Sequence, residues 1–150
     1  MNDQMEDGFK KLANSLIENG RTRQGGFVIR GAEILSDTLK EAITRKLNRA
    51  PPASGPRVCP KAFKDRIDVA RELGIITNEV HSELEKLREM RNRFAHATES
   101  QNLEEGEMNR LFLNLKRPNY DQKPYLEAYM ECVRAINDHV VEYLQTNFPD

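Results

Sequence analysis

Apolar residues recur every three or four positions along most of the chain, which is the spacing of one face of an α-helix. No stretch shows the period-two alternation that is typical of a half-buried strand. The apolar stripes cover residues 5–16, 28–47, 63–70, 80–94, 111–115 and 125–144. This pattern predicts an all-α fold, a compact bundle of five or six helices, in one domain that spans residues 1–150.

Glycine, proline and threonine mark the predicted helix limits. The segment RAPPASGPRVCP, residues 49–60, holds four prolines and one glycine, which predicts a loop inside the domain at about residues 50–60. Gly20 ends the first predicted helix, the Gly25–Gly26 pair precedes the second, and Gly74 ends the third. Thr77 is placed to cap the helix that follows Gly74.

Composition favours a soluble helical protein, because 31% of the residues are charged and 38% are hydrophobic. The formal net charge is −1, so a nucleic acid would have to meet a local basic patch. The first residues, MNDQMEDGFKK, contain no apolar run of signal-peptide or membrane-spanning length. We therefore expect a cytoplasmic protein without a membrane partner.

Cysteine and histidine are sparse. Cys59 and Cys132 are the two cysteines, and a disulfide is not expected between them in a reducing compartment. No CxxC or HxxxH pair is present, and the histidines at 81, 96 and 139 are scattered along the chain. The sequence therefore predicts neither a metal site nor a cofactor.

The segment LREMRNRFAHATE, residues 87–99, concentrates polar functional groups on one predicted helix. With about 100° per residue, Arg91 falls about 40° from Leu87 within the apolar stripe, and His96 falls about 180° from it. Arg91 is then either a structural arginine, which snorkels or pairs with a carboxylate, or part of a site. Asn92 and His96 are four residues apart, so a hydrogen bond between them would fix one imidazole tautomer.

Two parts of the chain resemble known helical proteins. LREMRNRFAH is similar to the signature of the HEPN superfamily, an arginine and a polar residue followed by a histidine, here Arg91, Asn92 and His96. Residues 30–43 (RGAEILSDTLKEAI) and 63–96 resemble the mannitol operon repressor family. The resemblance covers about residues 20–100, and its most specific element is the RNxFAH ending.

The resemblance implies a HEPN-like homodimer and two possible functions. The first is a regulatory protein of the mannitol operon repressor type, which acts in transcriptional repression through a protein partner. In that case Arg91 anchors the core, and Arg66 and His96 are structural or interface polar residues. The alternative is a metal-independent ribonuclease, in which the RNA meets Arg91, Asn92 and His96 in a dimer cleft. There His96 acts as general acid or base, Arg91 stabilises phosphate charge, and Asn92 orients the imidazole or the RNA.

A third hypothesis is direct DNA binding through a helix-turn-helix, because ARELGIITNEV has the spacing of that motif. The would-be recognition helix, NEVHSELEKL, carries Glu79, Glu83 and Glu85 against one lysine, which opposes approach to phosphates. Glu83 also occupies a position that should be apolar. We therefore predict an ordinary helical hairpin and no direct DNA binding.

Arg88 and Arg93 flank the motif and would be the basic side chains nearest to a bound RNA. Glu85 and Glu89 lie three and four residues before them, at the spacing of helical ion pairs. This arrangement favours a solvated, salt-bridged face over a phosphate-binding patch.

Overall fold

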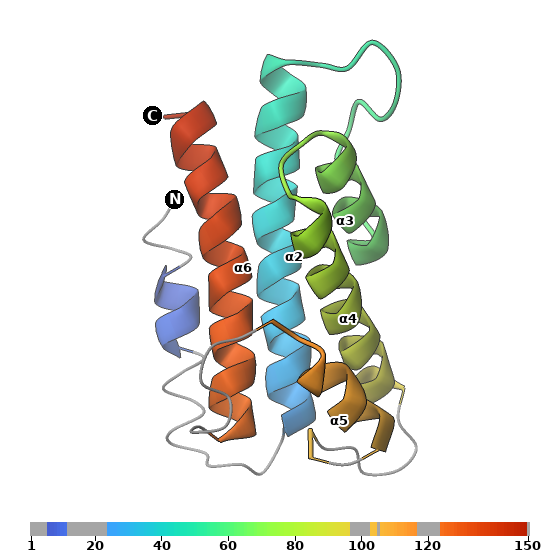
Figure 1. Cartoon of the computed structure of the whole chain (residues 1–150). Coiled ribbons are helices and arrows are strands. Elements are labelled where there is room, and N and C mark those ends of the chain that lie inside the picture. Colours follow the sequence, from blue (N-terminus) through green and yellow to red (C-terminus); the bar gives the residue numbers. More distant parts are fainter. Residues whose placement is uncertain (1–5, 12–23, 97–102, 105, 117–123, 150) are drawn as a thin grey trace.

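The computed structural model describes residues 6–11, 24–96, 103–104, 106–116 and 124–149 (Figure 1). Its helices are α2 (Gln24–Arg49), α3 (Phe63–Glu72), α4 (Asn78–Ala95), α5 (Gly106–Leu113) and α6 (Tyr125–Asn147), and residues 6–11 are also helical. The described residues contain no strand, so the predicted all-α bundle is confirmed. Most of the first predicted helix, with Gly20 at its end, lies outside the described residues.

The two longest helices, α2 and α6, run side by side in the same direction (Figure 1). Three hydrogen-bonded contacts fix their register. Tyr129 Oη donates to the carbonyl oxygen of Val28 at 2.8 Å, the Thr38 hydroxyl lies 2.6 Å from Asn137 Oδ1, and Arg45 Nη1 lies 3.4 Å from the carbonyl oxygen of Phe148. These pairs are separated by 101, 99 and 103 residues. A nearly constant separation is what a parallel pair requires.

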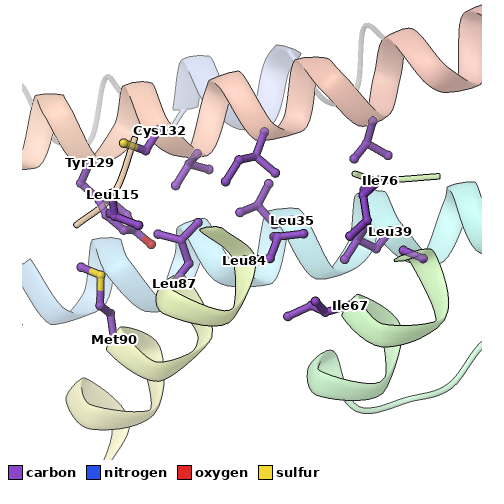
Figure 2. Packing of buried hydrophobic residues seen from close by; sticks show 14 of the residues in the cluster. Leu35, Leu39, Ile67, Ile76, Leu84, Leu87, Met90, Leu115, Tyr129 and Cys132 are labelled. Atoms are coloured by element: carbon purple, nitrogen blue, oxygen red, sulfur yellow. The ribbon is translucent and has the colours of Figure 1, made fainter. Parts of the chain in front are cut away.

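Helix α2 is the centre of the bundle, because it contacts α6, α3 and α4. Figure 2 shows Leu35, Ile67 and Leu84 from three helices pointing into one core. Each of these side chains is at most 1% exposed, so each contributes about 1.5–3 kcal/mol of hydrophobic stabilisation relative to an exposed position. Tyr129 is also fully buried, and burial raises the pKa of its phenol above the usual range, so its hydroxyl stays a neutral donor.

The turn between α3 and α4 is built from the residues that the sequence singled out. Gly74 has a φ of +75°, and its N–H donates to the carbonyl oxygen of Arg71 while Ile75 N–H donates to that of Ala70. These two bonds form a Schellman motif, which ends α3. The Thr77 side chain accepts a hydrogen bond from Val80 N at 3.2 Å, so the predicted cap of α4 is confirmed.

The prediction that the Gly25–Gly26 pair precedes the second helix is wrong, because α2 begins at Gln24 and includes both glycines. Gly25 lies against Phe94 of α4, and a Cβ atom at position 25 would be 2.9 Å from Phe94 Cδ1. Packing of the two helix ends therefore stabilises a helical start that glycine disfavours by about 1 kcal/mol.

Gly31 is buried where α2 crosses α6. A Cβ atom at this position would lie 3.0 Å from Tyr129 Oη and 3.2 Å from Val133 Cγ2. Neither atom can move freely, since the phenol is hydrogen-bonded to Val28 and valine is stiff at χ1. We expect Gly31→Ala to lower the free energy of unfolding by about 1–3 kcal/mol in urea denaturation, although alanine is the better helix former.

Gly8→Ala is the matched control, because a Cβ atom at Gly8 meets nothing within 4 Å. That variant should be as stable as the unchanged protein or slightly more stable. Equal stability of the two alanine variants would contradict the close packing of α2 on α6.

Candidate functional site

The residues of the RNRFAH segment lie at the carboxyl end of α4. His96 is the C-cap residue, and its backbone N–H donates to the carbonyl oxygen of Asn92 at 3.0 Å. Arg91 and Asn92 are half-buried, while His96 is exposed. The exposure of His96 agrees with the prediction that it points away from the bundle. The inward orientation of Arg91 stays a prediction, because Arg91 and Asn92 are both half-buried.

The side chain of Asn92 accepts a hydrogen bond from Arg91 and not from His96. Arg91 Nη1 donates to Asn92 Oδ1 at 3.0 Å, and no side-chain hydrogen bond joins Asn92 to His96 among the described residues. The hydrogen bond that the spacing of Asn92 and His96 made possible is not formed, because the guanidinium of Arg91, always charged and rich in donors, takes the amide oxygen. The amide oxygen therefore orients the arginine.

The two flanking arginines are neutralised within α4. Arg88 donates from Nε and Nη2 to Glu85 Oε2 at 3.2 and 2.9 Å, and Arg93 Nη2 lies 3.2 Å from Glu89 Oε1. The predicted salt-bridged face is confirmed at these pairs. Pairs of this kind add little stability at a surface, but they cancel charge that a phosphate would otherwise meet.

Arg91 differs from its neighbours, because its hydrogen-bond partner is a neutral amide. In the part of the chain that the structure describes, no carboxylate lies within ion-pair distance of its guanidinium. The predicted alternative in which Arg91 pairs with a carboxylate of a neighbouring helix is therefore not seen in that part. Among the described residues, its positive charge is therefore oriented by Asn92 without an acidic partner.

The end of α4 is held against the start of α2. Phe94 packs on Gly25, and Gln24 Oε1 accepts a hydrogen bond from the backbone N–H of Leu103 at 2.8 Å. Leu103 is fully buried, so this bond ties the chain beyond α4 to the same corner of the bundle. Arg91 and His96 are therefore presented from a fixed helix end.

Arg66 has a structural role at the Pro-rich loop. Its Nε donates to the carbonyl oxygen of Pro60 at 2.7 Å, and its Nη1 donates to Ser36 O at 3.2 Å and to Ser36 Oγ at 2.9 Å. The guanidinium thus joins α3 to the loop and to α2. None of these bonds reaches the RNRFAH segment.

Cys59 lies in the same loop with its thiol 3.4 Å from the carbonyl oxygen of Pro60. Burial raises the pKa of Cys59, although the nearby Arg66 guanidinium lowers it in part. The thiol is therefore a weak nucleophile at neutral pH. Cys132 is buried, and neither cysteine forms a disulfide bond.

The face of α4 that a recognition helix would present is covered by the chain that follows α5. Glu83, a half-buried residue, accepts a hydrogen bond from the backbone N–H of Lys116 at 2.9 Å, and Lys86 Nζ donates to the carbonyl oxygen of Asn114 at 2.9 Å. These contacts explain an acidic residue where a helix-turn-helix requires an apolar one. They agree with the predicted helical hairpin.

One group of side chains was missed at the level of sequence. His81 and Glu85 of α4 meet Asp68 of α3, at a place separate from the RNRFAH segment. The available signal was the spacing of four residues between His81 and Glu85, which puts both on one helix face. Asp68 could not be added without the α3–α4 turn.

Comparisons with protein-family models, curated proteins and solved structures find no match to this chain. The HEPN-like assignment therefore stays a prediction that rests on the quoted motifs. None of the described helices combines the length and the apolar character that crossing a membrane requires.

We expect Arg66→Ala to lower the free energy of unfolding by about 1–3 kcal/mol, because three hydrogen bonds of a charged group are lost. The loop should also open, so that iodoacetamide labels Cys59 faster at neutral pH, because relief of burial, the largest cause of the raised pKa, outweighs loss of the Arg66 guanidinium that lowers that pKa. Lys64→Ala, an exposed lysine on the same helix, is the control for both measurements. Labelling and stability that are the same in the two variants would contradict the anchoring role of Arg66.

Proposed function

We propose that this protein is a dimeric regulatory module of the mannitol operon repressor type, which acts in transcriptional repression through a protein partner. The observation that carries the proposal is the charge balance around the exposed end of α4. Arg88 and Arg93 are each paired with a glutamate of the same helix, and His96 is exposed beside them. A balanced surface of this kind suits a protein contact better than a phosphate backbone.

The acidic side chains of α4 support the same proposal. Glu79 lies 3.5 Å from Lys116 Nζ, and Glu83 accepts from the Lys116 backbone, so this face is engaged by the protein itself. Repression would then come from a contact with another protein and not from a helix in the major groove. In this proposal His96 lies in the homodimer interface, and Arg91 holds the helix end beneath it.

A second candidate function, the metal-independent ribonuclease, is favoured by one specific observation. The charge of Arg91 is oriented by a neutral amide, and His96 is the C-cap residue of the same helix. In this candidate Arg91 stabilises negative charge on the phosphate, and His96 acts as general acid or base. Asn92 then positions the guanidinium, and the second subunit encloses the exposed imidazole.

The repressor proposal is tested in the native host with a reporter for the mannitol-uptake operon. We expect deletion of the gene to raise reporter expression several-fold, and His96→Glu to do the same because a carboxylate in the interface opposes dimerisation. Sedimentation should show a dimer for the unchanged protein and a monomer for His96→Glu. Lys64→Glu, which places the same charge on α3, should keep both repression and the dimer.

An unchanged reporter after deletion would contradict the repressor proposal. A gel shift of the operator DNA by the purified protein alone, at about 0.15 M salt, would contradict the part played by the partner.

The ribonuclease candidate is tested by incubating several RNAs with purified protein in excess chelator. We expect no cleavage above the His96→Ala background. Cleavage that falls by about 10²–10⁴-fold in both Arg91→Ala and His96→Ala, and that persists in Arg93→Ala, would replace the repressor proposal with the ribonuclease. Arg93→Ala is the matched control, since it removes a neighbouring cation that Glu89 already neutralises.

A further inference from the structure

Three potential metal ligands meet between α3 and α4. His81 Nε2 lies 2.8 Å from Asp68 Oδ1, and one donor atom each from Asp68, His81 and Glu85 lies within 4.8 Å of the others. The His81 side chain is 15% exposed and that of Asp68 is 37% exposed, so the group is sheltered but open to solvent on one side.

The hairpin fixes two helices around this group. His81 and Glu85 are one helical turn apart on α4, and therefore share a face. Asp68 comes from α3, thirteen residues before His81, and the Gly74 turn and the Thr77 cap set the position of α3 against α4. The donor set is thus held by two helices and not by loops.

Two arginines face the group from the same pair of helices. Arg88 directs both of its hydrogen bonds to Glu85 Oε2, and among the described residues no hydrogen bond reaches Oε1. Arg71 Nη1 lies 3.5 Å from His81 Nδ1, a distance at which a hydrogen bond is weak. Because a guanidinium can only donate, this contact favours the tautomer in which Nδ1 carries the lone pair and Nε2–H donates to Asp68.

We propose that Asp68, His81 and Glu85 bind a divalent transition-metal ion, and that Zn²⁺ is the ion they suit best. One imidazole and two carboxylates are donors that Zn²⁺ accepts, with water in the remaining position. The imidazole favours Zn²⁺ over Mg²⁺ and Ca²⁺, which prefer sets made of oxygen donors.

Binding requires small movements. Donors around a tetrahedral Zn²⁺ lie about 3–3.5 Å apart, and since all three donor atoms lie within 4.8 Å of one another, no pair has to approach by more than roughly 1–2 Å. The partly exposed Asp68 and Glu85 side chains can make this approach by rotation. The proton on His81 Nε2 moves to Nδ1 through solvent, so that the neutral imidazole offers its Nε2 lone pair to the ion. Arg71 then turns away, because Nδ1 no longer has a lone pair to accept its hydrogen bond. The ion would clamp α3 to α4.

The test uses the full chain, first stripped with a chelator and then titrated with Zn²⁺ by calorimetry and by thermal unfolding. We expect one Zn²⁺ per chain and a higher Tm, with affinity lowered at least about tenfold in both His81→Gln and Glu85→Gln. His139→Gln and Cys59→Ser should bind as the unchanged protein does, which excludes the other half-buried histidine and the loop thiol. The Arg71→Gln variant should bind Zn²⁺ more tightly than the unchanged protein does. Mg²⁺ should leave the Tm of the unchanged protein where it is.

Absence of Zn²⁺ binding by the unchanged protein would overturn the proposal, as would undiminished binding by His81→Gln. Circular dichroism without metal shows whether each variant is folded, and if His81→Gln is not, Glu85→Gln decides in the same way. The imidazole resonances of His81 should shift with Zn²⁺ while those of His96 do not. Neither readout depends on repression or on RNA cleavage, so failure here is distinct from failure of the proposed function.

Discussion

The close parallel packing of α2 on α6 is the contact on which the rest of the bundle depends. It favours a glycine at position 31, because a Cβ atom there would lie 3.0 Å from Tyr129 Oη, and the phenol is held in place by its 2.8 Å hydrogen bond to Val28. A parallel pair of helices also needs a long connection between the end of one and the start of the other. Helices α3, α4 and α5 lie within that connection, and α3 and α4 pack on the other side of α2.

From this arrangement the two candidate sites acquire different surroundings. The RNRFAH segment ends α4 beside the first turn of α2, where Phe94 packs on Gly25. The Asp68–His81–Glu85 group lies in the first half of α4, close to the turn that joins α3 to α4. Helix α4 thus holds Arg91 near its carboxyl end and two of the three proposed metal ligands, His81 and Glu85, in its first half.

Charge matching separates the residues that support the fold from those that are available for a ligand or partner. Arg88, Arg93 and Lys86 are each paired with a glutamate three or four residues before them, and these pairs make α4 a solvated helix of balanced charge. Arg66 donates from Nε and Nη1 to backbone and hydroxyl oxygens of the loop and α2. Arg91 has a neutral amide as its partner among the described residues, and this is the observation that favours the ribonuclease candidate.

The sequence by itself determined the helical class, the Pro-rich loop, the end of α3 at Gly74, the Thr77 cap and the outward direction of His96. These features follow from periodicity and from backbone preferences that act within a few residues. Only the tertiary structure decided that Gly25 lies inside a helix, that Asn92 accepts a hydrogen bond from Arg91, and that Asp68 hydrogen-bonds to His81. Each of these depends on which residue is nearest in space. Phe94 packs on Gly25, the Arg91 guanidinium takes the Asn92 amide oxygen, and the turn after α3 brings Asp68 of α3 against His81 of α4.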